Sequence, residues 1–236
     1  MEELFNTYIE NAFGDFKQAE FKFEQFDFNY REFFPRDKNA KLLDIGIGRG
    51  EMLSFFRNLG YVNYLGIDIS RSCVDFCRSL GLNVELVDSI ISFIKDKSET
   101  YDLITMIDVL EHIPKDEIIP ILKAINNSLK SDGTFIIQVP NLNSPEGFLH
   151  MFNDFSHLNG FNEHSLSQVL IAAGFKYIYF KPFETIIGNS IKRRIRRCLR
   201  ELVYVKYKIE RRITSNLSYS IMTPVFFAVV KKYTNK

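Results

Sequence analysis

The chain has no tryptophan, only three cysteines and seven prolines among its 236 residues. The cysteines (Cys73, Cys77 and Cys198) are too few for a disulfide framework, and they lack the spacing of a zinc site. Long apolar runs are also missing, since the longest, 224–230, has the length of a strand rather than of a membrane span. The N-terminus carries no basic-then-apolar signal pattern. We therefore expect a soluble, cytoplasmic protein that folds without disulfides.

The composition is that of a globular protein, with 46% apolar and 25% charged residues, and it excludes a disordered, collagenous or fibrous chain. The length favours a single domain with an insertion over two domains. Within residues 1–236 we expect an N-terminal helical lid (1–36), a core (37–187), a basic helical insertion (188–221) and a last strand (222–236).

Charge is distributed unevenly, although the net charge is only +1. Residues 191–236 carry 13 lysines and arginines against 2 acidic residues, whereas residues 1–190 carry 17 against 27. Most of the excess lies in 191–212, where apolar residues recur at helical spacing between arginines. Three interpretations remain open: a solvated helix packed on the domain, a cap whose arginines hold a phosphate-bearing acceptor, or a helix on a membrane surface. Nucleic acid is disfavoured as a partner, because the acidic remainder would oppose a phosphate backbone.

Short apolar runs alternate with helical patterns from residue 41 onward. The predicted strands are 41–45, 64–67, 84–87, 103–107, 134–139, 176–182 and 225–231, and the predicted helices are 50–59, 71–80, 116–129 and 163–173. This alternation predicts a doubly wound α/β fold, in which a mostly parallel sheet has helices on both faces. The stretch 141–160 is rich in Asn, Ser, Pro and Gly and is predicted to be a functional loop.

The most informative segment is residues 42–50, LLDIGIGRG, a predicted strand that leads through a glycine-rich turn into a helix. Such a turn lets ligand atoms approach the backbone and aims the free N–H groups of the helix at a negative group. Asp44 precedes the turn, where a carboxylate would repel a pyrophosphate but attract an amino or sulfonium cation. Asp68 and Asp88 end the next two predicted strands, and an acid at the first of these positions accepts hydrogen bonds from ribose hydroxyls. Three acids at successive strand ends predict a ligand site at the switch point of the sheet.

At these residues the chain resembles the class I S-adenosylmethionine-dependent methyltransferases. LLDIGIGRG is similar to that family's first motif, YLGIDIS to its second and Asp88 to its third, while LKSDGTFIIQVPN resembles the stretch through its fifth strand. YDLITMIDVLEHIP resembles its fourth strand and the Asp-Val-Leu-Glu-His segment of its ubiquinone-biosynthesis-like branch. The resemblance covers about residues 40–182, and it implies a Rossmann-like, seven-stranded sheet whose last strand runs antiparallel beside the sixth.

The same resemblance implies S-adenosylmethionine as the cofactor and S-adenosylhomocysteine as the product. The residues that it places around the cofactor are Asp44, Gly46, Gly48, Asp68, Ile69, Asp88, Ser89, Ile90, Ile107, Asp108 and His112. Among them, Asp44 would contact the amino group, the glycines the methionine part, Asp68 the ribose and Asp88 the adenine amine.

The phenylalanine-rich N-terminal segment is predicted to cover the cofactor site. Tyr30 and Arg31 could reach the methionine carboxylate of the cofactor, and ordinary packing is an equally good interpretation of Tyr30. His112 follows the fourth strand at its catalytic end, where it either borders the cofactor or is satisfied by the backbone at a helix start.

The candidate base lies in residues 152–161, FNDFSHLNGF, after the fifth strand, where the family binds acceptors. Asp154 and His157 are three residues apart, and a carboxylate that orients an imidazole favours uptake of a hydroxyl proton near neutral pH. A pair that merely stabilises the loop fits the spacing equally well. No metal site is expected, because the histidines lack a second ligand pair with usable spacing. The segment also resembles methyltransferases encoded with bacterial capsule and surface-polysaccharide genes.

The expected function is methyl transfer to an oxygen of a sugar or phosphate-type substituent in capsule or surface-polysaccharide biosynthesis. The acceptor would be a small molecule or a glycan- or nucleotide-linked group, anionic, with peripheral contact to the inner membrane face through 191–212. A quinone-type O-methyltransferase and a noncatalytic cofactor-binding protein of the same fold remain open alternatives. An NAD-dependent dehydrogenase is disfavoured by Asp44 and by the absence of a G-x-G-x-x-G spacing.

Overall fold

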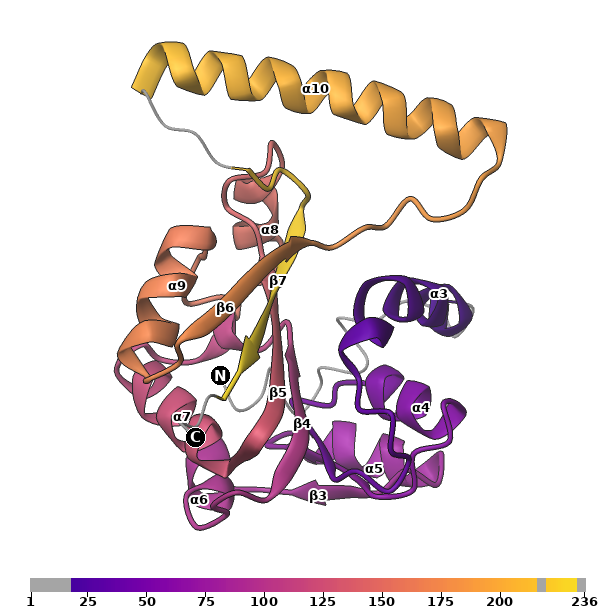
Figure 1. Ribbon diagram of the computed structural model, residues 1–236, viewed down its shortest axis with the longest axis vertical. Coiled ribbons are helices and arrows are strands. Elements are labelled where there is room, and N and C mark those ends of the chain that lie inside the picture. The colour runs from indigo at the N-terminus through magenta and orange to yellow at the C-terminus, as the bar shows by residue number, and fades with distance from the viewer. Residues whose placement is uncertain (1–17, 216–219, 233–236) are drawn as a thin grey trace.

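The computed structural model describes residues 18–215 and 220–232, and within them seven strands form one sheet in the order β3-β2-β1-β4-β5-β7-β6 (Figure 1). The strands are β1 (Leu42–Ile45), β2 (Tyr64–Asp68), β3 (Val84–Leu86), β4 (Tyr101–Ile107), β5 (Leu129–Pro140), β6 (Tyr177–Pro182) and β7 (Val225–Lys231). β7 runs antiparallel to both β5 and β6, whereas the pairs among β1 to β5 are parallel. The predicted mostly parallel sheet with an antiparallel last strand is confirmed.

Helices cover both faces of the sheet, so each face has its own apolar core. The helices are α3 (Gln18–Tyr30), α4 (Glu51–Asn58), α5 (Arg71–Ser79), α6 (Ile90–Ile94), α7 (Lys115–Ser128), α8 (Gly147–Asn153), α9 (Glu163–Ala172) and α10 (Ile191–Ser215), with 3-10 turns η1 (Arg31–Phe33) and η2 (Leu110–His112). Figure 1 shows α3, α4 and α5 on one side of the sheet and α6, α7 and α9 on the other. This doubly wound arrangement is the predicted one.

β1 lies in the middle of the sheet with both faces covered, and all four of its residues are buried. Asp44 is the exception to the apolar rule in β1, and its register places it beside Gly66 of β2 and Thr105 of β4. The structure adds α6, η2 and α8 to the predicted elements. β5 also begins five residues earlier than predicted, because Leu129 already pairs with Tyr101 of β4.

Residues 1–17 of the predicted lid lie outside the described residues, and its remaining part, 18–36, contains α3 and η1. α3 packs on α4 through aromatic rings, such as Phe26 against Phe55 at 5.8 Å between centroids. Tyr30 at its end is fully buried and stacks edge-on to Phe227 of β7. Arg31 is exposed and pairs with Asp27 at 2.6 Å.

The basic insertion forms α10, a single helix that crosses one end of the molecule away from the sheet (Figure 1). It is attached by Tyr204, its one buried residue, and by Arg200, whose guanidinium donates to both oxygens of Glu184 at 2.5 and 2.8 Å. Its apolar residues are exposed, up to 80% for Ile213. At 100° per residue these side chains (Ile191, Ile195, Leu199, Leu202, Val205, Ile209 and Ile213) form one stripe on the side opposite Tyr204. The stripe therefore faces away from the body, which differs from the first of the three interpretations of this segment.

Among the described residues, no helix combines the length and the apolar character that a membrane span requires.

Candidate functional site

A cavity of about 680 Å³ opens at the carboxyl ends of β1, β2 and β4. Every residue predicted to border the cofactor lines it: Asp44, Gly46, Gly48, Asp68, Ile69, Asp88, Ser89, Ile90, Ile107, Asp108 and His112. Neither Tyr30 nor Arg31 is among the lining residues, so packing is the correct interpretation of Tyr30. α3 contributes Lys22 and Phe26 to the wall instead, and α7 contributes Glu117, which the sequence patterns did not single out.

The turn after β1 requires glycine at position 46, because of its backbone conformation and its close packing. Gly46 has a φ of +75°, and a Cβ built there would lie 2.3 Å from Cγ2 of Val109. Its N–H donates to the carbonyl of Ile67 at 2.9 Å, which fixes the turn against β2. A side chain at this position would fill the space between the turn and the end of β4. The missing side chain thus leaves the backbone itself as the wall of the cavity.

Asp44 lies beneath this turn and is only 2% exposed. Burial raises the pKa of its carboxyl to about 8; the charges of Asp68 and Glu51 act in the same direction, and the hydrogen bond from Thr105 opposes them. The Thr105 hydroxyl donates to Asp44 Oδ1 at 2.6 Å and thereby orients the carboxyl group. A buried acid with a raised pKa favours an arriving cation, since a nearby positive charge stabilises the carboxylate. This environment fits a ligand that carries an ammonium group.

Asp68 is held at the neighbouring strand end by backbone donors. The N–H of Ser70 donates to its Oδ1 at 2.8 Å and the N–H of Gly48 to its Oδ2 at 3.4 Å. Burial raises the pKa of Asp68, while these backbone hydrogen bonds lower it. Asp88 is exposed at the end of β3, and Ser89 caps α6 by accepting from the N–H of Ser92 at 3.1 Å. The two acids therefore both line the cavity, at the ends of neighbouring strands.

Asp108 lies at the end of β4 with a φ of +54°, a backbone conformation that Asp tolerates better than most residues. The side-chain amide of Gln138 in β5 donates to both of its oxygens, at 3.1 and 3.0 Å. The hydroxyl of Tyr30 in turn donates to Gln138 Oε1. Burial raises the pKa of Asp108, and the Gln138 hydrogen bonds lower it. The polar residue within the apolar run FIIQVP was the signal for Gln138 that the sequence analysis missed.

A comparison with known protein families identifies the class of protein, because the model of a methyltransferase domain family matches residues 19–179. The chain belongs to this family. The methyltransferase uses S-adenosylmethionine, which supplies a methyl group bound to a positively charged sulfur. The cavity fits this cofactor: Asp44 suits its ammonium group, Asp68 its ribose hydroxyls, and the glycine turn leaves the space that a side chain would occupy.

Solved structures share the fold of the methyltransferase. An S-adenosylmethionine-dependent methyltransferase from Archaeoglobus fulgidus superimposes with a TM-score of 0.70 at 21% identity, covering 98% of this chain and 99% of that one. A chain from Haloferax volcanii in complex with the Trm112 methyltransferase activator gives 0.66 at 15% identity, with 100% and 98% covered. Phosphoethanolamine N-methyltransferase 2 from Haemonchus contortus gives 0.63 at 13% identity, with 98% and 61% covered. A search of curated proteins found no match.

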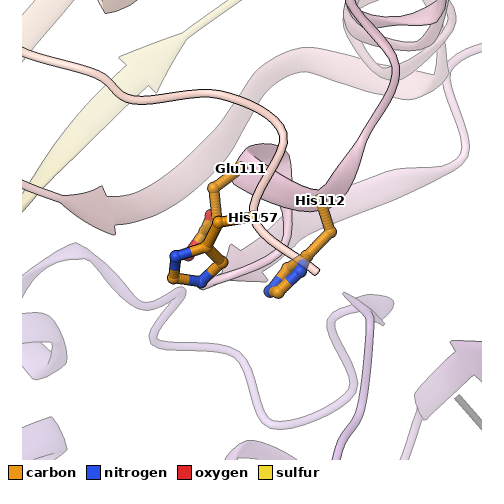
Figure 2. Close-up of side chains that lie close together, drawn as sticks. All are labelled: Glu111, His112 and His157. Carbon is orange, nitrogen blue, oxygen red and sulfur yellow. The ribbon is translucent and has the colours of Figure 1, made fainter. Parts of the chain in front are cut away.

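A second group of side chains gathers at the end of β4, where η2 carries Glu111 and His112, and the loop between α8 and α9 carries His157 (Figure 2). The loop is tied to η2 because the N–H groups of Leu158 and Asn159 both donate to the carbonyl of Glu111, at 2.8 and 3.1 Å. The two imidazole rings lie 4.7 Å apart between centroids. His112 and Leu158 line the cavity, so this cluster lies at its border.

The hydrogen bonds that hold the Asp154 carboxylate come from Ser156. Asp154 Oδ1 accepts from the N–H and the hydroxyl of Ser156, at 2.8 and 2.6 Å, and Ser156 Oγ lies 2.9 Å from His112 Nδ1. His157 Nδ1 lies 2.9 Å from the carbonyl oxygen of His150. The carboxylate thus acts through Ser156 on His112, while the backbone positions His157. The reason is local, since Asp154 and Ser156 close a tight turn that leaves the carboxylate facing the serine.

These contacts define which ring nitrogens carry hydrogen. The single hydroxyl hydrogen of Ser156 points to Asp154, so His112 Nδ1 must donate to Ser156 Oγ. A carbonyl oxygen only accepts, so His157 Nδ1 donates to His150. Burial and the neighbouring His157 lower the pKa of His112. When neutral, each imidazole therefore carries its lone pair on Nε2.

Proposed function

We propose that the methyltransferase transfers its methyl group to a hydroxyl oxygen of a sugar or phosphate-type substituent in bacterial capsule or surface-polysaccharide biosynthesis. The observation that carries the oxygen assignment is the imidazole pair His112 and His157 at the border of the cavity. A hydroxyl acceptor must lose a proton, and neutral imidazoles promote that loss near neutral pH. Asp154 supports His112 through Ser156.

The acceptor class is supported by the loop that follows β5 and by the charge of α10. The loop contains α8 and the segment with Asp154 and His157, which resembles methyltransferases of surface-polysaccharide gene clusters. α10 contains most of the excess of basic over acidic residues in 191–236, and arginines bind phosphate groups well. A flat, apolar quinol has no charged group with which these arginines could interact. We therefore favour an anionic acceptor, small or linked to a nucleotide or glycan, over a quinone-type acceptor.

We also propose that α10 contacts the inner face of the membrane, where a lipid-linked acceptor would be found. Its exposed apolar stripe faces away from the body, and Lys192, Arg194 and Arg212 flank that stripe at helical spacing. α8 adds exposed aromatic residues, with Phe148 and Phe152 in ring contact. Figure 1 shows α8 at the same end of the molecule as α10.

An acceptor screen tests the proposed activity. S-adenosylhomocysteine release is measured with S-adenosylmethionine and a panel of nucleotide sugars, phosphorylated sugars, lipid-linked glycans and a hydroquinone. Turnover with an anionic sugar is expected, and His157→Asn should lower kcat by about 100-fold while the affinity for S-adenosylhomocysteine stays unchanged. Turnover with the hydroquinone alone would replace the proposal with the quinone-type alternative. A chain that binds the cofactor and turns over none of these acceptors would favour the noncatalytic one.

Vesicle sedimentation tests the membrane contact. The full chain should pellet with vesicles of phosphatidylglycerol and phosphatidylcholine but remain in solution with phosphatidylcholine alone, because basic side chains need an anionic surface. A Leu202→Glu, Ile209→Glu double variant should lose this binding. Val62→Glu, which makes the same change at an exposed apolar residue far from α10 in sequence, should bind as the unmodified chain does. Equal sedimentation of all three proteins would show that the stripe is not the contact.

A further inference from the structure

The carboxyl group of Glu111 is the least explained polar group of the described structure. Glu111 is 1% exposed, and neither of its side-chain oxygens has a hydrogen-bond partner among the described residues. A buried carboxyl group without a partner is unfavourable for folding, because nothing compensates the loss of its hydration. The surrounding structure supplies two imidazoles rather than a donor. From this juxtaposition we propose that Glu111, His112 and His157 bind a divalent transition-metal ion.

The geometry is close to that of a bound ion. One potential ligand atom from each of the three residues lies within 4.8 Å of the others. Ligand atoms at about 2.0–2.2 Å from one ion lie roughly 3–4 Å from each other, so only small side-chain rotations are needed. In Figure 2 the Glu111 carboxylate lies beside the His157 ring, and the His112 ring points to the same side.

The hydrogen bonds around the two imidazoles are those of metal ligands. Metal-bound histidines typically donate their other ring N–H to a carboxylate, a carbonyl or a water, which fixes the ring and its tautomer. His157 Nδ1 donates to the carbonyl of His150, and His112 Nδ1 donates to Ser156, which passes the interaction to Asp154. Both rings are thereby held in the tautomer whose Nε2 can bind a metal.

The ligand set selects the class of ion. Two imidazole nitrogens and one carboxylate suit Zn²⁺, Mn²⁺ or Fe²⁺, whereas Mg²⁺ and Ca²⁺ prefer oxygen ligands. Three protein ligands also leave coordination positions open. The site borders the cavity through His112, so an acceptor oxygen could occupy one of these positions.

The role of the ion rests on the proposed function. A hydroxyl group bound to the ion has a lowered pKa, so its O–H bond breaks, the proton passes to water and the electron pair stays on oxygen. With the ion bound, the two imidazoles promote this proton loss as ligands of the ion. Asp154 and Ser156 are positioning residues, because they act on the ion through His112.

Metal binding is tested directly, without an acceptor. The full chain, stripped with a chelator, is dialysed to equilibrium against Zn²⁺, Mn²⁺ or Mg²⁺ in a Cys198→Ser background, because the exposed Cys198 thiol could itself bind zinc. We expect one Zn²⁺ or Mn²⁺ per chain and much weaker binding of Mg²⁺. Glu111→Gln and His157→Asn should each weaken binding by about 100-fold or more, and Ser156→Ala by about 10-fold. The matched controls Glu85→Gln and His164→Asn change exposed residues elsewhere and should bind as the parent does.

Absence of one-to-one binding by the parent chain would overturn the proposal, and so would equal binding by the site variants and the controls. S-adenosylhomocysteine is titrated into the same samples, so that the two proposals fail separately. Cofactor binding without metal binding would remove the metal site and leave the methyltransferase assignment intact. Metal binding without turnover of any hydroxyl acceptor would remove the role of the ion and the proposed function, but not the site. If Glu111→Gln fails to fold, metal binding by His157→Asn and the rise in the Tm of the parent on adding metal serve as the test instead.

Discussion

The cavity and α10 use charge in opposite ways. In and beside the cavity, the carboxyl groups of Asp44 and Glu111 are at most 2% exposed, and burial raises the pKa of each. On α10 the basic residues are largely in water, and the apolar residues are exposed beside them. Buried charge is unfavourable for folding unless a partner compensates it, so its presence at one sheet edge indicates a ligand. Exposed apolar residues on α10 indicate a surface contact instead.

The two regions also differ in how firmly the fold holds them. The cavity wall is made of strand ends and the turns between them, each fixed by several backbone hydrogen bonds. α10 is attached through Tyr204 and the pairing of Arg200 with Glu184, together with contacts of Arg197 to the preceding loop. Substitutions at the cavity should therefore change stability and cofactor affinity, and substitutions on the α10 stripe should change neither.

The largest effect is expected at the glycine turn. Gly46→Ala should lower the free energy of unfolding by about 2–4 kcal/mol, because a positive φ is combined with a side-chain clash. The new Cβ would lie 2.3 Å from Val109 Cγ2. Gly60→Ala is the matched control, since Gly60 also has a positive φ, of +83°, but no atom within 4 Å of the new Cβ. It should lose only about 1 kcal/mol, the strain alone. Urea unfolding measures both, and equal losses would show that the turn is not tightly packed against β4.

A somewhat smaller effect is expected on the cofactor. Asp68→Ala removes an acceptor for the two ribose hydroxyls and should weaken S-adenosylhomocysteine binding by about 100-fold, as the loss of charged hydrogen bonds implies. Titration calorimetry measures this affinity. Asp75→Ala, at an exposed acid on α5, is the control and should bind normally. An unchanged affinity in Asp68→Ala would refute the assignment of the ribose site.

Much of the cavity could be predicted because its residues lie at strand ends, where chain order and sheet order together fix their place. Asp44 and Asp68 belong to adjacent parallel strands, so their carboxyl ends meet whatever the details of the helices. The turn glycines are likewise dictated locally, since only glycine fits the backbone there.

The histidine cluster could not be predicted, because a loop folding back on η2 forms it. The spacing of Asp154 and His157 suggested a direct pair, but the intervening Ser156 takes the carboxylate and passes its effect to His112. Glu111 belongs to the Asp-Val-Leu-Glu-His segment of the sequence analysis, but only the structure shows that its carboxyl group is buried beside two imidazoles. The helical pattern of 191–212 was correctly recognised as amphipathic, yet only the tertiary structure shows which side faces the body.

The pH dependence of stability sharpens the contrast between buried and exposed acids. The pKa of Asp44 in the folded chain, about 8, lies above its ordinary value of 3.8. Between these two pH values the Asp44 carboxyl is therefore protonated in the folded chain and ionised in the unfolded chain. With respect to this group, the free energy of unfolding is therefore highest at low pH and falls as the pH rises through this range. Asp44→Asn should flatten the decline between pH 4 and 8 in urea unfolding. The decline should not vanish, because Asp68 and Asp108 also have raised pKa values. Asp75→Asn, at an exposed site, should leave the curve unchanged, and an identical curve for Asp44→Asn would mean that Asp44 is already ionised.

The smallest effect is expected on α10, where it separates a surface helix from a structural one. Leu202→Glu and Ile209→Glu should each change the free energy of unfolding by less than about 0.5 kcal/mol, because both side chains are already more than half exposed. Tyr204→Ala, on the opposite side of the same helix, removes the one buried contact and should loosen α10 from the body. Hydrogen exchange of α10 measures this loosening, while the affinity for S-adenosylhomocysteine should stay constant in all three variants. A loss of stability in the stripe variants comparable to that of Gly46→Ala would show that the stripe packs against the body. The two regions would then belong to one structural unit rather than to a cofactor site and a separate contact surface.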